Sequence, residues 1–205
     1  RLVGSEMCIR DRIWASRLGI YLFRRVQKDG KDVRFEKAKT HFFWFLQYWM
    51  GQALWVSLTA CAAIIAILSP EEDSLPVLAM LGMALWLTGF TIESISDYQK
   101  RVFRKENNPS KSFIHTGLWA RSRHPNYFGE ITLWTGIAII ALNTLAGIEY
   151  ITLISPVFVY ILLTRMSGVN LLERIADERY GELEEYQRYK KNTPVLIPKL
   201  SKDKN

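Results

Sequence analysis

The apolar residues of this 205-residue chain lie in long blocks, and these blocks limit the folds open to it. Each block is about 20 residues long, the length that an α-helix needs to cross the hydrocarbon core of a bilayer. A soluble domain would instead spread its apolar residues periodically along its helices or strands. The blocks therefore predict an all-α fold, a polytopic transmembrane helix bundle.

The sequence predicts about four full spans. The first opens with Trp and Phe residues, which are typical of an aromatic belt at a membrane interface. The second is expected to continue beyond the bilayer as a polar helix, to about Lys105. The four spans are expected near residues 42–68, 75–95, 127–142 and 148–166.

Shorter segments lie on either side of these spans. Residues 13–23 are too short to cross a bilayer and predict a partial N-terminal helix, either the cut end of a longer helix or an interfacial one. Residues 167–205 are predicted to be a cytoplasmic C-terminal segment, with amphipathic helices that break near Gly181 and a loop from Thr193. We interpret residues 13–205 as a single membrane domain.

Residues 1–12, which read RLVGSEMCIRDR, do not fit this domain. From Leu2 onward they resemble one reading frame of a common sequencing-library adapter. They also have neither the apolar region nor the cleavage site of a signal peptide. We interpret them as an artefact joined to a truncated gene, with a short basic tail as the alternative.

The basic residues fall on one side of the predicted membrane topology. Outside residues 1–12, every Lys and Arg lies in one of three segments, 13–41, 96–125 and 165–205. The turns at 69–74 and 143–149 contain none. Because Lys and Arg concentrate in cytoplasmic loops, we expect both ends of the chain in the cytoplasm. The net charge of +7 thus reflects topology, and we expect no nucleic-acid partner.

Cysteine and histidine do not indicate a metal site. The two cysteines, Cys8 and Cys61, make no disulfide framework, and the three histidines show no metal-ligand spacing.

The stretch GLWARSRHPNYFGE, residues 117–130, is dense in polar residues although it lies between apolar blocks. Arg121 and Arg123 precede Pro125, which fits the first turn of a helix, and two arginines beside a helix N-terminus suit a phosphate group. Asn126 and Glu130 share one helical face. Anchoring of lipid headgroups by the arginines is the alternative.

Two further polar clusters are expected on the cytoplasmic side. Gly89, Glu93, Asp97 and Arg101 recur every four residues where the second span ends, as either a functional site or a solvated helix end. After the fourth span, Glu173, Asp177 and Tyr180 share a helical face, in a helix that covers a pocket or lies on the membrane. Together the three clusters suit an anionic, water-soluble ligand that meets a lipid-buried partner.

At these same residues the chain resembles the steroid 5-alpha-reductase family, in particular its small uncharacterised membrane branch. The resemblance covers nearly everything after residue 12. The matching stretches are GFTIESISDYQKRVF at 89–103, GLWARSRHPNYFGE at 117–130, SGVNLLERIADERYG at 167–181 and YQRYKKNTPVLIP at 186–198, together with Arg17, Leu18 and KDGKDVRF at 28–35.

The resemblance implies a membrane-embedded, NADPH-dependent reductase. Members of the family bind NADPH in the cytoplasmic half of a helix bundle and reduce an enone-type carbon–carbon double bond in a sterol-like or other lipid substrate. The expected partners are that hydrophobic substrate and membrane lipids. By resemblance, the cofactor contacts are Glu93, Asp97, Arg101, Arg104, Arg123, Asn126, Tyr127, Glu130, Arg174, Asp177 and Tyr180.

The resemblance leaves the catalytic acid unassigned. Hydride addition to the β carbon of an enone develops negative charge on the carbonyl oxygen, which an acid must hydrogen-bond. In the steroid reductases the Glu and Tyr that do so come from earlier helices, which are missing or barely present here. We therefore expect the truncated chain to be inactive.

Two other functions remain open. The isoprenylcysteine carboxyl methyltransferases share an R-H-P-x-Y element and bind S-adenosylmethionine, although their motif does not usually carry the Asn126 and Glu130 pair with Glu93, Asp97 and Gln99 upstream. A non-catalytic membrane protein with a decayed site is the other alternative, although the polar residues of all three clusters are present.

Overall fold

The computed structural model describes residues 40–68, 76–107, 112–166 and 168–199, with scattered residues between 9 and 27. Over these residues the secondary structure is helical and contains no β-strand, which confirms the predicted all-α class. The predicted partial helix at 13–23 lies largely outside the described residues, although those described between 12 and 27 are helical.

The longest helices match the predicted spans. Helix α2 (Phe42–Leu68) coincides with the first span, and α3 (Pro76–Glu106) contains the second together with its polar continuation. Helix α4 (Pro125–Ala141) lies where the third span was expected. Within the described chain, three helical runs are long and apolar enough to cross a membrane, namely Phe42–Leu68, Val77–Glu106 and Gly147–Tyr180. The predicted number was four, and the difference lies in α4, which has only 17 residues.

The fourth expected span is helical but is not one uniform α-helix. It consists of a 3-10 helix η4 (Gly147–Leu153), helix α5 (Ile154–Ile161) and a π-helix η5 (Leu162–Met166). Pro156 has no N–H to donate to the carbonyl of Thr152, four residues earlier. That carbonyl instead accepts a hydrogen bond from Cys61 Sγ at 3.3 Å. The proline thus accounts for the change of helix type near residue 154.

The chain divides into two compact units, one of which contains Arg1–Leu75 and Ala141–Ser155. Within this unit α2 packs against η4 through small side chains, and Ala62, Ala63 and Ala66 are buried. Ser155 Oγ donates a hydrogen bond to the carbonyl of Thr59. The wide apolar surface of α2 that remains exposed is what a membrane-spanning helix presents to lipid.

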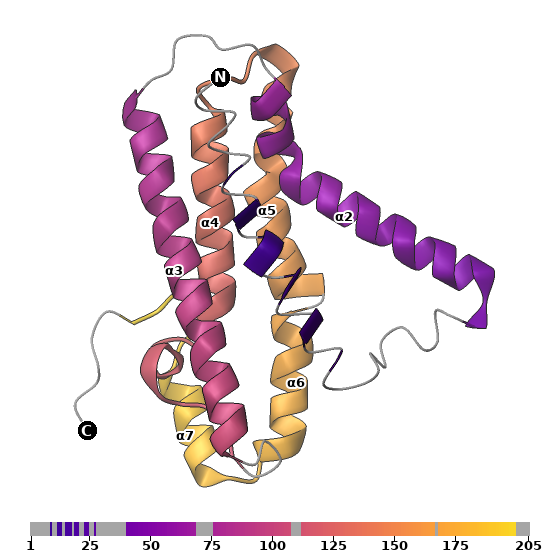
Figure 1. Cartoon of the computed structure of the whole chain (residues 1–205). Helices are drawn as coiled ribbons and strands as arrows, with labels where there is room; N and C mark the ends of the chain where they lie inside the picture. The colour runs from indigo at the N-terminus through magenta and orange to yellow at the C-terminus, as the bar shows by residue number, and fades with distance from the viewer. Residues whose placement is uncertain are drawn as a thin grey trace. The chain divides into compact units, whose positions relative to one another are not determined.

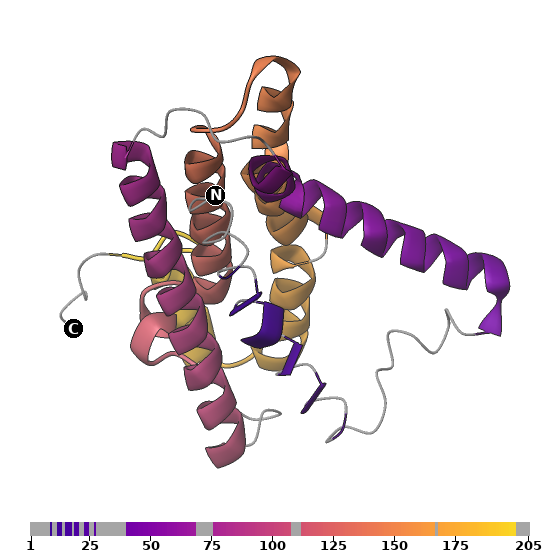
Figure 2. The same ribbon diagram turned by 45° about the horizontal axis from the view of Figure 1, so that its top comes forward.

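The other unit contains Pro76–Ile140 and Pro156–Asn205, and its α3 and α4 lie side by side in antiparallel directions (Figures 1 and 2). Two glycines on each helix, seven residues apart, form the contact. Gly82 faces Gly136 and Gly89 faces Gly129, so closely that a Cβ on Gly89 would lie 2.5 Å from the Gly129 carbonyl oxygen. Small residues allow such close approach between membrane helices. The glycine contact therefore fixes the polar end of α3 against the start of α4.

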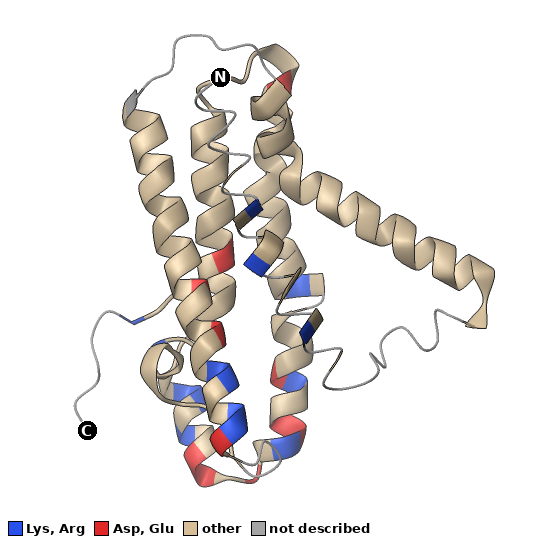
Figure 3. Ribbon diagram, viewed as in Figure 1, with Lys and Arg blue, Asp and Glu red and all other residues tan. Residues whose placement is uncertain are grey.

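Helices α6 (Val169–Tyr180) and α7 (Glu184–Asn192) form the predicted C-terminal pair, and the first of them ends just before Gly181, where a break was expected. Charged residues gather on the last turns of α3 and on α6 and α7, whereas α2 carries none (Figure 3). The charged end of this unit contains the candidate site.

Candidate functional site

The segment from Arg121 to His124 is held by backbone from the end of the chain. Its N–H groups at Arg123 and His124 donate to the carbonyls of Pro194 and Val195, at 2.9 and 3.1 Å. Ser122 is fully buried, and its hydroxyl donates to the Leu196 carbonyl at 2.8 Å. The tail was predicted as a loop, and its described residues 194–199 form one. Their hydrogen bonds hold the polar segment 121–124 in place, and we call this contact the brace.

Substitution of Ser122 by alanine tests this brace. The change removes the hydroxyl that donates to the Leu196 carbonyl, whereas the His124 N–H keeps the Val195 carbonyl as its acceptor. We expect a loss of about 1 kcal/mol in the free energy of unfolding, the net contribution of one intramolecular hydrogen bond. Thermal unfolding in detergent measures it. An unchanged midpoint would show that the brace does not contribute to stability.

A short 3-10 helix, η3 (Gly117–Ala120), ties the same region to α3. Gly117 has a positive φ of 63°, which favours glycine, and the side chain of Gln99 fills the space where a Cβ would lie. The Leu118 N–H donates to Gln99 Oε1 at 3.0 Å, and the indole N–H of Trp119 donates to the Ser96 carbonyl at 3.1 Å. These hydrogen bonds fix the position of Trp119, whose ring lines the site.

Helices α6 and α7 are joined by an ion pair and a hydrogen bond that both involve Asp177. Lys190 Nζ lies 2.6 and 2.7 Å from the two carboxylate oxygens, and the Tyr186 hydroxyl donates to Oδ1 at 3.0 Å. Burial and this hydrogen bond raise the pKa of Tyr186 above its usual range, so the phenol stays protonated and remains a donor. The Tyr189 hydroxyl donates to the Trp119 carbonyl at 2.7 Å, so α7 also contacts η3.

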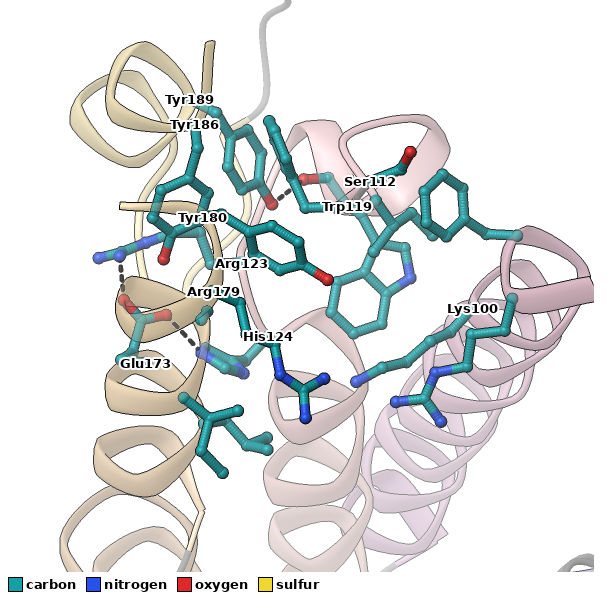
Figure 4. Close-up of a pocket in the computed structure, with 17 residues that line it drawn as sticks. Lys100, Ser112, Trp119, Arg123, His124, Glu173, Arg179, Tyr180, Tyr186 and Tyr189 are labelled. Carbon is teal, nitrogen blue, oxygen red and sulfur yellow. Dashed lines mark hydrogen bonds and ion pairs between the residues drawn. The ribbon is translucent and has the colours of Figure 1, made fainter. Parts of the chain in front are cut away.

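These elements line an open pocket of about 180 Å³. Aromatic side chains form much of its wall, and the ring of Phe113 lies within 5.8 Å, between centroids, of Tyr180, Tyr186 and Tyr189. Figure 4 shows the labelled residues around the pocket. The lining residues are Lys100, Phe103, Arg104, Ser112, Phe113, Ile114, Trp119, Arg123, His124, Leu172, Glu173, Ile175, Ala176, Arg179, Tyr180, Tyr186 and Tyr189.

The lining carries a clear excess of positive charge. Four of its residues, Lys100, Arg104, Arg123 and Arg179, are cations, and Glu173 is the only acid among them. Glu173 forms an ion pair with Arg123, and its other oxygen lies 2.8 Å from His124 Nε2 (Figure 4). The pocket therefore suits an anionic ligand with a flat aromatic or heterocyclic part.

A second polar group lies where α3 meets the start of α4. Glu93 is buried, and a Cβ on Gly129 would lie 2.7 Å from its backbone nitrogen, so the two helices touch here. The carboxylates of Asp97 and Glu130 lie close enough to the Tyr127 hydroxyl to act on it electrostatically. The Tyr127 ring stacks on His124, with 5.5 Å between centroids and an interplanar angle of 9°. This stacking connects the second group with the pocket.

The structure gathers some of the predicted site residues and leaves others outside. Arg104, Arg123 and Tyr180 line the pocket. Arg101 lies over the ring of its neighbour Tyr98, 5.5 Å from the centroid. The Arg174 side chain is 71% exposed, and its Nε atom lies 3.9 Å from Glu178 Oε1. Neither Arg101 nor Arg174 lines the pocket. Asp177 does not line it either, and its carboxylate binds Lys190 of α7.

Several lining residues were absent from the predicted set. Lys100 is the clearest, since Asp97, Lys100 and Arg104 share one helical face at spacings of three and four. Arg179 likewise follows Leu172 and Ala176 on the pocket face of α6. Helical spacing could have found both. The pairing of Glu173 with Arg123 joins segments 50 residues apart, and spacing carries no signal for it.

Comparisons with known proteins place the chain in a family. A profile described as "Protein of unknown function (DUF1295)" matches residues 7–193. No solved structure matches.

Curated relatives confirm the steroid 5-alpha-reductase resemblance. A mouse protein named "3-oxo-5-alpha-steroid 4-dehydrogenase 1" is 31% identical over 121 residues, which cover 59% of this chain and 42% of that protein. Proteins of the same name are 27% identical in human, over 59% of this chain and 41% of theirs, and 37% identical in cattle, over 29% and 23%. The chain thus spans less than half the length of the curated relatives it matches. It belongs to the DUF1295 family, a family of steroid 5-alpha-reductase-like proteins.

Proposed function

We propose that the protein is a membrane-embedded, NADPH-dependent reductase of an enone-type carbon–carbon double bond in a sterol-like or other lipid substrate. The observation that carries the proposal is the cationic, aromatic pocket, which adjoins the polar group where α3 meets α4. The names of the curated relatives, 3-oxo-5-alpha-steroid 4-dehydrogenase 1, support the same reaction class.

The residues that line the pocket suit the phosphate-bearing part of a dinucleotide. Arg104 and Arg179 line the pocket and make no ion pair with the other described residues, so their charge is available to phosphate groups. Phe113 and Trp119 contribute aromatic rings to the pocket wall, where a base or the nicotinamide could pack. The Asn126 Oδ1 atom is buried and accepts no hydrogen bond in the described part of the chain. An amide donor from a ligand would satisfy it.

Each group of residues then has a distinct part in binding. Arg104, Arg123 and Arg179 would bind phosphates, while Asp97 and Asn126 would orient the nicotinamide or ribose end. NADPH supplies the hydride for the β carbon of the enone when it is bound. The stacked His124 and Tyr127 rings lie between the two groups, so a dinucleotide that reaches both would pass beside them. The acid that hydrogen-bonds the substrate carbonyl is not assigned to a residue of this chain.

The membrane supplies the other substrate. An apolar substrate dissolves in the lipid around the spans, whereas NADPH reaches the charged end of the unit from water. We propose that this end, and both ends of the chain, face the cytoplasm, because the basic residues concentrate there.

Ligand-dependent thermal stability tests the proposal. The protein in detergent is heated with NADPH, NADH or S-adenosylmethionine, and we expect NADPH to raise the unfolding midpoint because it binds only the folded state. Asp97→Ala and Asn126→Ala are each expected to remove most of that increase. Leu54→Ala, on the exposed surface of α2, is the matched control and should keep it.

Other outcomes lead to other conclusions. Stabilisation by S-adenosylmethionine alone would contradict the proposed reductase function and favour a methyltransferase. A protein that none of the three ligands stabilises would contradict both enzymes and favour a non-catalytic membrane protein.

A further inference from the structure

Glu173 on α6 is enclosed between two basic neighbours from the segment before α4. Oε2 accepts a hydrogen bond from Arg123 Nη1, and Oε1 lies 2.8 Å from His124 Nε2. The side chains of Glu173, Arg123 and His124 are 18%, 12% and 7% exposed. Because both carboxylate oxygens are used, the carboxylate fixes the directions of two side chains at once.

The ion pair compensates the charge of Arg123 but leaves most of its donors available. A guanidinium has five N–H groups, and Glu173 accepts from one nitrogen, Nη1. Arg123 Nε is buried without an acceptor in the described part of the chain, although the side chain lines the pocket. Arg123 is therefore a directional hydrogen-bond donor in this pocket, whereas Arg104 and Arg179 supply net charge.

The backbone of Arg123 and His124 is fixed independently of Glu173. Both N–H groups donate to carbonyls of the tail, at Pro194 and Val195. Removal of the carboxylate would thus free the two side chains without releasing the segment that carries them. The His124 ring also lies against Tyr127, so its orientation extends to the second polar group.

The geometry points to Glu173 as the positioning residue of this site: it aims the remaining Arg123 donors into the pocket and holds the His124 ring against Tyr127. The inference rests on the proposed function, in which the bound anion is the phosphate-bearing part of NADPH. Glu173 itself does not contact the ligand in this role and acts through its two neighbours.

Positioning and simple electrostatics predict opposite effects for Glu173→Gln. The substitution removes the only negative charge from a lining with four cations, so electrostatics alone predicts tighter binding of any anion. Positioning predicts weaker binding, because the glutamine cannot hold both neighbours as a carboxylate does. We expect the dissociation constant for NADPH to rise about tenfold, as for the loss of one hydrogen bond to a charged group.

The experiment is a double-mutant cycle on the protein in detergent. Dissociation constants for NADPH and for inorganic pyrophosphate are measured for wild type, Glu173→Gln, Arg123→Lys and the double variant. Arg123→Lys retains the charge but removes the forked donors. Glu178→Gln is the control, because Glu178 lies on the same helix, is 68% exposed and does not line the pocket. Unfolding midpoints without ligand show that each variant is folded.

The expected pattern is weaker binding in both single variants, little further loss in the double variant and no change in Glu178→Gln. A purely structural Glu173 would give additive losses, which would overturn the inference, as would equal or tighter binding in Glu173→Gln. If wild type binds pyrophosphate but not NADPH, the proposed function fails, and the same cycle on pyrophosphate decides the inference. If wild type binds neither, the pocket is not an anion site, and both are wrong.

Discussion

Gly89→Ala is expected to destabilise the protein more than Gly82→Ala, the other glycine substitution in α3. The new Cβ would lie 2.5 Å from the Gly129 carbonyl oxygen and 2.5 Å from the Leu133 backbone nitrogen. These are backbone atoms of α4, so no side-chain rotation relieves the overlap, and the two helices must separate. Overpacking of this kind costs about 1–3 kcal/mol, and we expect the upper end or beyond.

Gly51→Ala is the matched control. Gly51 lies inside a helix of the same character, α2, and a Cβ there would meet no atom within 4 Å. Because alanine favours a helix over glycine by about 1 kcal/mol, this variant should be neutral or slightly more stable. Thermal unfolding of both variants in detergent gives the comparison. Equal midpoints would show that α3 and α4 are not in close contact at Gly89.

The combined variant Arg104→Ala with Arg179→Ala is expected to abolish measurable NADPH binding. Each arginine lines the pocket from a different helix, α3 or α6. Loss of one charged hydrogen-bonding group lowers affinity about tenfold to a hundredfold, and two independent losses multiply. The dissociation constant is measured for wild type, for each single variant and for the double variant, at one fixed salt concentration because exposed charges are screened.

Two further arginines separate this prediction from a general effect of charge. Arg188→Ala removes an exposed cation from α7 that does not line the pocket, and it should leave the affinity unchanged. Arg174 was assigned to the cofactor from sequence, whereas the structure leaves it 71% exposed. If Arg174→Ala weakens binding as much as Arg179→Ala does, the sequence assignment is right and the pocket geometry is not the binding geometry.

The long helices were predictable because length and hydrophobicity decide them. Helix α2 matches its predicted span, and α3 extends beyond its span as the polar sequence indicated. The π-helix and the 3-10 helix in the last span were not predicted, because hydropathy carries no information on hydrogen-bond pattern. Pro156 was the one local signal, and it explains only the start of α5.

The candidate site was predicted as three clusters, and their detailed contacts depend on tertiary structure. Asp177 illustrates this: its place in the sequence suggests a ligand contact, yet α7 brings Lys190 and Tyr186 to it. The pairing of Glu173 with Arg123 likewise requires α6 and the start of α4 to meet. Helical periodicity describes one helix at a time and carries no information on contacts between separate helices.

The brace between residues 121–124 and 194–199 has a consequence for the order of folding. The Ser122 hydroxyl reaches a carbonyl 74 residues later in the chain, after α4, α5, α6 and α7 have all been synthesised. Contacts of such large sequence separation form late, because closing the loop costs entropy before the contact rewards it. The helix pair α3 and α4 can therefore insert early, whereas the binding pocket matures only when the last turns of the chain have docked.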